Sequence, residues 1–106
     1  MYEVMIESTA MQDLRGIFIY ISDRLYAPES AQRVYRSIKR AVLSLDDMPA
    51  RFPLVREEPY ASLGVRFMPV ENYNAFYVIN EGTKTVHVIR IVYNRREWQA
   101  LLTMDF

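Results

Sequence analysis

The first half of the chain carries hydrophobic residues at the spacing of two α-helices. Ahead of them, residues 2–6 alternate between apolar and polar types well enough to predict a short strand. The first helical stripe consists of Ala10, Leu14, Ile17, Phe18, Ile21 and Leu25. Thr9 and Gln12 have the spacing of a capping box at the start of this helix. Pro28 predicts its end, because the residue before a proline is forced out of the α region.

Pro28 also suits the first position of a second helix, with Glu29 favourable in the first turn. The apolar stripe of this helix comprises Ala31, Val34, Tyr35, Ile38, Ala41, Val42 and Leu45. Its complementary side carries the basic residues Arg33, Arg36, Lys39 and Arg40. Such a basic stripe is most often a solvated face. Because the connection between the two helices is very short, we expect them to form an antiparallel hairpin.

The second half of the chain reads as an irregular segment followed by three strands. Residues 46–63 contain several prolines, which interrupt regular structure, although a helical turn can form near Ala50 and Arg51. The runs 65–70, 75–79 and 85–93 have strand character, and turn-forming residues join them in hairpins. The third run is the longest and most apolar, so we expect it in the centre of the sheet.

The element order β-α-α-β-β-β predicts an α+β fold, with the helical hairpin packed on one face of a small, mainly antiparallel, twisted sheet. We expect residues 1–106 to form a single domain of this kind. Strict alternation along the last run would place Val86, Val88, Arg90 and Val92 on one face, and Thr85, His87, Ile89, Ile91 and Tyr93 on the other. Both faces are apolar. One should meet the helices, and the other should stay open for a partner.

Composition narrows the possible classes of protein. Half of the 106 residues (51%) are hydrophobic, and 13 basic residues balance 13 acidic ones, which is unlike a general nucleic-acid binder. The absence of cysteine excludes disulfide scaffolds, thiolate metal sites and cysteine nucleophiles, and a single histidine excludes a histidine-rich metal cluster. No apolar run approaches the ~20 residues that a membrane span needs. We therefore expect a soluble cytoplasmic protein without membrane contact, metal or cofactor.

The candidate chemistry lies in a basic and aromatic group on the last three strands and just beyond them. The chain has no glycine-rich phosphate loop, no G-x-S-x-G and no H-E-x-x-H. The group comprises Arg66, Tyr73, Tyr77, His87, Arg90, Tyr93, Arg95, Arg96 and Trp98. Arginine pairs with phosphate and aromatic rings stack on bases, so these residues are candidates for RNA or target binding. The alternative is that the tyrosines are half-buried sheet residues and the arginines a solvated strand end.

Two further side chains have competing interpretations. His87 is the one side chain that titrates near neutrality without help, which makes it an acid–base candidate. Its position between Val86 and Val88 equally suits a structural imidazole. Asp13 is expected to be a cap or surface residue.

Several segments, taken together and in order, resemble the RelE/ParE superfamily, the toxin halves of bacterial type II toxin–antitoxin modules. Residues 10–21 and 28–31 are similar to the first and second helices of the family. Residues 64–66, 72–79 and 86–96 are similar to its strands. The resemblance runs through nearly the whole chain. It implies a cognate antitoxin that lays an extended or helical segment over the toxin.

The resemblance leaves the target open. RelE-like members cut messenger RNA on the ribosome without a metal, whereas ParE-like members poison DNA gyrase. Arg66 lies near the family's basic residue on the second strand, and Arg95 matches the arginine after the last strand. Asn74, however, stands where the nucleases carry an arginine, and the expected C-terminal tyrosine or histidine is absent.

Acid–base chemistry would then depend on His87 or Tyr93. The missing nuclease residues and the long helical hairpin favour a gyrase inhibitor. In that case Arg66, Tyr73, Arg90, Arg95, Arg96 and Trp98 would bind the target. The alternatives are a ribosome-dependent endoribonuclease that uses Arg66 and Arg95, and a non-toxic interaction module on the same fold.

Overall fold

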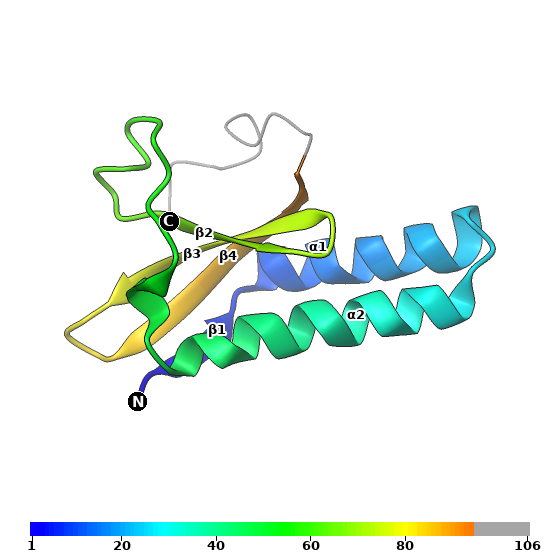
Figure 1. Cartoon of the computed structure of the whole chain (residues 1–106), viewed down its shortest axis with the longest axis horizontal. Coiled ribbons are helices and arrows are strands. Elements are labelled where there is room, and N and C mark those ends of the chain that lie inside the picture. The colour runs from blue at the N-terminus through cyan, green and yellow to red at the C-terminus, as the bar shows by residue number, and fades with distance from the viewer. Residues whose placement is uncertain (95–106) are drawn as a thin grey trace.

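The chain folds into two helices packed on one face of a four-stranded sheet (Figure 1). The structure is a computed structural model that describes residues 1–94. The elements are β1 (Glu3–Ile6), α1 (Ser8–Ile19), the π-helical turn η1 (Tyr20–Arg24), α2 (Pro28–Leu43), the 3₁₀ turns η2 (Ser44–Asp46) and η3 (Pro49–Arg51), β2 (Arg66–Val70), β3 (Tyr73–Asn80) and β4 (Thr85–Tyr93). The α+β class and the predicted element order are confirmed.

The strand order is β1-β4-β3-β2, which places β4 inside the sheet as its length and hydrophobicity predicted. β4 pairs in parallel with β1 and antiparallel with β3, and β3 pairs antiparallel with β2. β1 covers only the first part of the β4 edge, up to Val88. None of the helices within residues 1–94 is long and apolar enough to cross a bilayer.

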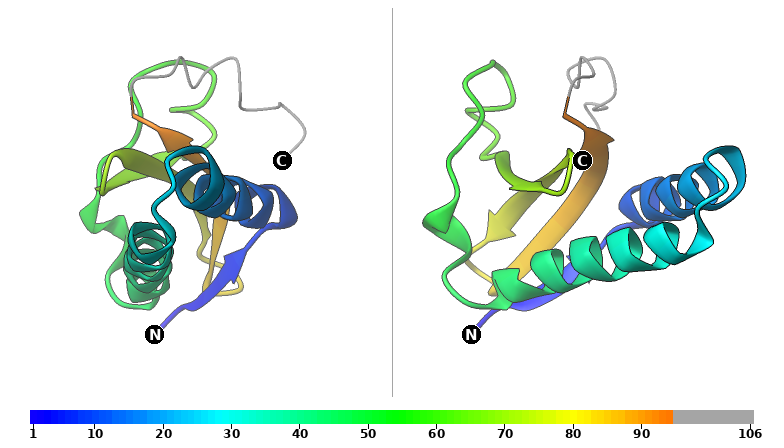
Figure 2. Two further views of the ribbon diagram at one scale, coloured as in Figure 1. Left: turned by 90° about the vertical axis from the view of Figure 1, so that its right-hand side faces the viewer. Right: turned by 45° about the vertical axis from the view of Figure 1, so that its right-hand side comes forward.

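The core between the sheet and the helices uses the predicted apolar stripes. Leu14 of α1 and Ile38 of α2 are completely buried against Tyr77 and Val88 of the sheet. Burying one such aliphatic side chain contributes about 1.5–3 kcal/mol. The two helices together form an arm, residues 8–43, whose far end projects beyond the sheet (Figure 2).

A β-bulge corrects the predicted faces of β4. Phe76 pairs with Arg90 but the next residue, Tyr77, pairs with Val88, so Ile89 is an extra residue on β4. The extra residue shifts the alternation from there on. Ile91 therefore joins Val88 in the helix-side core, while Val92 lies on the opposite face, which reverses the strict-alternation prediction for both residues.

The ends of the first helix also differ from prediction. Thr9 does not cap the helix, because α1 begins at Ser8 and the Thr9 hydroxyl donates instead to the Ile89 carbonyl of β4 at 2.8 Å. The regular helix stops at Ile19 and continues as a π-helical turn. Leu25, expected in the apolar stripe, is 54% exposed. The turn into α2 places Tyr26 in the left-handed region, with φ of +53°.

The face of the sheet away from the helices, here called the outer face, is covered in part by the chain itself. The segment 53–65 crosses it and buries Val55, Tyr60 and Val65 against Phe76 and other residues of the sheet. The Val55 amide donates to the Val65 carbonyl at 2.9 Å, which closes this segment into a loop. The expectation of a wholly open second face was therefore wrong, since isolated apolar residues between prolines gave no signal of where the loop would pack.

Candidate functional site

The predicted basic and aromatic group does not form one cluster within residues 1–94. Arg95, Arg96 and Trp98 lie outside the described residues. The remaining members are distributed over both faces and one edge of the sheet.

Arg66 holds a loop in place. Its Nη1 donates to the carbonyl oxygens of Phe52, at 2.6 Å, and Ala50, at 3.3 Å. Tyr77, its register partner on β3, donates its hydroxyl to the Pro49 carbonyl. Burial raises the pKa of the Tyr77 phenol, and the nearby guanidinium groups only partly offset this effect. These two side chains therefore anchor residues 49–52 to the sheet.

Arg90 is bound by an acidic residue that was predicted to be a cap or surface group. Its Nε and Nη2 donate to the two carboxylate oxygens of Asp13, at 2.8 and 3.0 Å. The same carboxylate accepts the Ile91 amide at 2.8 Å. The pKa of Arg90 is raised, chiefly by its hydrogen bonds to the Asp13 carboxylate. Asp13 thus binds the edge of β4 beyond the end of β1. Without it, this part of the strand would have an unpaired amide at its edge.

His87 lies on the outer side of the sheet. Its neighbours Val86 and Val88 point into the helix-side core, and Nδ1 lies 3.0 Å from Oε2 of Glu7. The imidazole is about one-third exposed, with 32% of its surface accessible. A histidine paired with a carboxylate is a sound acid–base couple. Arg66, which shares a face with Tyr77 of the helix-side core, lies on the opposite side of the sheet.

Tyr73 and Tyr93 form an aromatic pair at the end of the sheet near the arm. Their rings meet edge to face, with centroids 5.7 Å apart and an angle of 74°. Burial raises the pKa of Tyr73, and the nearby phenols of Tyr93 and Tyr20 and the Glu71 carboxylate raise it further. These effects disfavour the phenolate form of Tyr73. It is four residues along β3 from Tyr77, the partner of Arg66, so roughly 13 Å of strand separates the tyrosine pair from Arg66.

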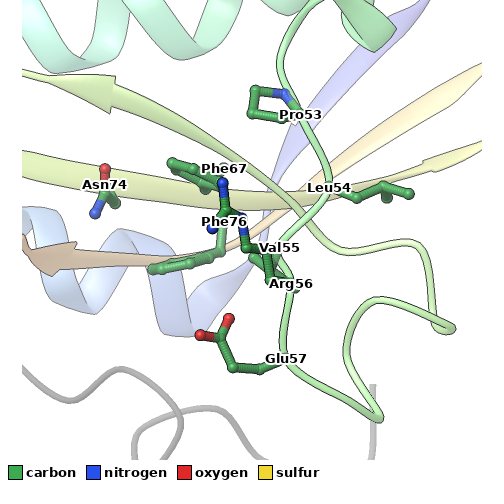
Figure 3. A pocket seen from close by; sticks show the side chains of 8 residues that line it. All are labelled: Pro53, Leu54, Val55, Arg56, Glu57, Phe67, Asn74 and Phe76. Carbon is green, nitrogen blue, oxygen red and sulfur yellow. The ribbon is translucent and has the colours of Figure 1, made fainter.

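A pocket on the outer face was not predicted at the level of residues. It has a volume of about 340 Å³ and is lined by Pro53, Leu54, Val55, Arg56, Glu57, Phe67, Asn74 and Phe76. Phe67 and Phe76 are register partners on β2 and β3, and Figure 3 shows their rings beside the 53–57 segment. The lining of the pocket mixes these apolar side chains with the polar groups of Arg56, Glu57 and Asn74. Apart from the apolar character of the outer face, no sequence pattern indicates this pocket, since five of its eight lining residues come from the irregular segment.

The arm carries the exposed basic stripe that was predicted for the second helix. Arg33 pairs with Glu71 at 3.3 Å, and Lys39 lies 5.8 Å from the ring centroid of Tyr35. Arg36 and Arg40 are exposed. Within residues 1–94, no group of three or more His, Asp or Glu side chains is arranged to hold a metal ion.

Comparison with known proteins places the chain among bacterial toxins. A family model described as ParE toxin of type II toxin–antitoxin system, parDE, matches residues 4–98. No curated protein sequence matches significantly. Among solved structures, the chromosomal ParDE system from P. aeruginosa is similar, with a TM-score of 0.72 and 23% identity over 88% of this chain and 96% of the other. The RelBE2 toxin–antitoxin complex from Mycobacterium tuberculosis has a TM-score of 0.65 and 21% identity over 87% and 96% of the two chains. At these identities, the two structures show a shared fold.

Proposed function

The chain belongs to the ParE toxin family of type II toxin–antitoxin systems, and from this premise we propose that it arrests growth by binding DNA gyrase and is neutralised by a cognate antitoxin. In this proposal the toxin works as a binding protein rather than as a nuclease. The evidence for choosing between these two modes is where the structure places the predicted basic and aromatic residues within 1–94.

Metal-independent RNA cleavage needs a base, an acid and a cation around one phosphate. Arg66 is bound to main-chain carbonyls, and Arg90 is bound to Asp13. His87 lies on the other face of the sheet from Arg66, and the Tyr73–Tyr93 pair lies at its far end. The dispersal of these groups is the observation that favours a binding mode. Arg95, Arg96 and Trp98 remain predicted target contacts.

The pocket on the outer face supports an antitoxin contact. The partly exposed side chains of Leu54 and Phe67 offer apolar surface, while Arg56, Glu57 and Asn74 offer polar groups at the rim. An extended or helical segment with one or two apolar anchors fits such a site, because buried anchors carry most of the energy of a protein interface. We assign this pocket to the antitoxin.

A gyrase assay with the purified chain tests the proposal. At micromolar excess over gyrase, the chain should inhibit supercoiling or trap the gyrase–DNA cleavage complex, and prior addition of the antitoxin encoded beside it should abolish the effect. Growth arrest accompanied by new cuts in translated messages would establish the nuclease alternative instead. Unimpaired growth on overexpression without antitoxin would identify a non-toxic module.

A further inference from the structure

Helix α2 carries a run of positive charge that no acidic residue interrupts. The basic stripe, Arg33, Arg36, Lys39 and Arg40, is exposed throughout, and residues 30–45 contain no aspartate or glutamate. Arg36 is three residues from Arg33 and Lys39 and four from Arg40, so like charges are neighbours on the helix surface. Like charges at this spacing destabilise a helix. The fold therefore gains nothing from this arrangement, whereas an anion bound from outside would relieve the repulsion.

Much of this charge is left uncompensated by the rest of the chain. Within residues 1–94, Arg36 and Arg40 have no hydrogen bond or ion pair. Arg33 pairs with Glu71 at 3.3 Å, but 63% of its side chain stays exposed. Glu29 lies in the first turn of α2, at one end of the stripe. Two guanidinium groups are thus available for phosphate, to which arginine donates two parallel hydrogen bonds.

The basic stripe points away from the core. At 3.6 residues per turn, Arg36 lies on the side of α2 opposite Val34 and Ile38, which are buried against the sheet. From Arg33 to Arg40 the stripe spans roughly 10 Å along the helix axis, which equals the rise of about three phosphates on one strand of DNA. Because α2 belongs to the projecting arm, the sheet does not obstruct this side of the helix (Figure 2).

The composition of this surface favours a nucleic acid over a protein as its partner. No large apolar side chain is exposed on α2 between residues 28 and 42. Protein interfaces draw most of their energy from buried anchors, which are largely aromatic or apolar. Binding to a nucleic acid backbone depends instead on cations placed against phosphates.

We propose that the basic stripe contacts the phosphate backbone of the DNA that gyrase holds, so that the toxin binds the gyrase–DNA complex more tightly than gyrase alone. The inference rests on the proposed function, because it names a contact within that same complex. The stripe is a local patch on a chain whose net charge is zero. The pocket assigned to the antitoxin lies on the other face of the sheet, so antitoxin binding should not depend on the stripe.

A double variant, Arg36→Gln with Arg40→Gln, tests the contact. The matched control is Arg15→Gln with Arg24→Gln, which removes two exposed arginines from α1 and η1 and gives the same net charge. Changing both Arg36 and Arg40 to Lys keeps the charge and should preserve binding, since lysine also contacts phosphate. Fluorescence anisotropy measures the affinity of each labelled protein for gyrase alone and for gyrase on duplex DNA, at several salt concentrations.

The glutamine variant of the stripe should lose affinity for gyrase on DNA by about tenfold or more at physiological salt. The slope of log affinity against log salt should become shallower by about 1 for each lost phosphate contact. Affinity for gyrase alone and for the antitoxin should stay within about twofold of wild type. The Tm should not fall, because the variant removes like-charge neighbours.

Three outcomes overturn the inference and leave the proposed function intact. They are a salt slope equal to that of wild type, an equal loss of affinity in the Arg15 and Arg24 control, and an equal loss for gyrase without DNA. The last of these would identify the stripe as a protein contact. A wild-type chain that neither binds nor inhibits gyrase overturns the proposed function and this inference together.

Discussion

At the scale of single residues, the Asp13 carboxylate supplies a hydrogen-bond acceptor at the edge of β4, where a longer β1 would otherwise have paired. It accepts two hydrogen bonds from Arg90 and one from the Ile91 amide, and both side chains of the ion pair are largely shielded from solvent. Removing it leaves a guanidinium and a main-chain amide without these acceptors. Such an ion pair contributes much less to the free energy of unfolding than its Coulomb energy, because both groups lose water on folding. Leaving a buried donor without an acceptor, however, lowers stability strongly.

We therefore expect Asp13→Ala to lower the free energy of unfolding by about 2–3 kcal/mol. Asp23→Ala, an exposed carboxylate on η1, should change it by less than about 0.5 kcal/mol. Urea unfolding followed by circular dichroism measures both. Equal effects for the two variants would show that Asp13 is no more than a surface charge.

The buried phenol of Tyr77 predicts a loss of stability in alkali. Its pKa in the folded chain is raised above the ordinary value of 10.0, so the native protein keeps a proton that the unfolded chain releases. This contribution is complete below pH 10 and disappears as the pH rises through the folded-state pKa. Tyr73 is shifted in the same direction.

Unfolding free energies measured between about pH 8 and pH 11 should fall with pH above 10. Tyr77→Phe should fall less steeply, after a loss of about 1 kcal/mol at neutral pH for the hydrogen bond to Pro49. Tyr26→Phe, which removes an 88% exposed phenol, should keep the wild-type slope. Identical slopes for all three proteins would contradict the assignment.

At the scale of elements, the connection between α1 and α2 is strained. Tyr26 adopts φ of +53°, a region that costs a non-glycine residue roughly 1–2 kcal/mol. The Tyr26 ring is exposed, so replacing it removes few packing contacts. The strain is the consequence of turning sharply between a π-helical turn and a helix that begins at a proline.

Tyr26→Gly should stabilise the fold by about 0.5–1 kcal/mol, since glycine reaches the left-handed region without penalty but loses more backbone freedom. Leu25→Gly, next to it with φ of −101°, should destabilise it by a similar amount. Thermal unfolding of the two variants beside wild type checks the opposite signs. A destabilised Tyr26→Gly would mean that the ring packs in solution.

Elements whose hydrophobic pattern extends over many residues were predictable from the sequence, but the irregularities within them were not. The helical stripes around Leu14 and Ile38 followed from the spacing of apolar residues. The central position of β4 followed from the length and hydrophobicity of that run. The bulge at Ile89 and the π-turn after Ile19 depend on contacts with other elements. No local pattern encodes them.

The candidate site was predictable only as a set of residue types. The sequence places Arg66 on one strand and His87 and Arg90 on another, but it does not reveal that Phe52, Glu7 and Asp13 bind them. Each of these partners lies more than ten residues away in the sequence. The pocket has the same origin, because it forms where segment 53–57 meets β2 and β3.

At the scale of the whole molecule, the sheet separates two surfaces. The pocket lies on the face that segment 53–65 crosses. The arm covers the other face (Figure 1). A chain with zero net charge gains no general attraction to nucleic acid, so specific contacts on these surfaces must supply its affinity for partners.

If the antitoxin occupies the pocket, Leu54→Asp should weaken its binding by at least tenfold, because an added carboxylate must lose water on an apolar site. Leu63→Asp is the matched control. Both leucines are exposed, at 42% and 48%, and belong to the same loop, but Leu63 does not line the pocket. Titration calorimetry with the antitoxin encoded beside the toxin gives both affinities. An equal loss of antitoxin affinity in the two variants, or no loss in either, would show that the antitoxin binds elsewhere.

The anchoring of residues 49–52 has a consequence for how such modules diverge. Arg66 and Tyr77 donate to main-chain oxygens, which every amino acid possesses, so exposed side chains of the following segment, such as Leu54 and Arg56, can change without loosening these anchors. Duplicated copies can then drift toward different inhibitors, one substitution at a time, without first dismantling the scaffold.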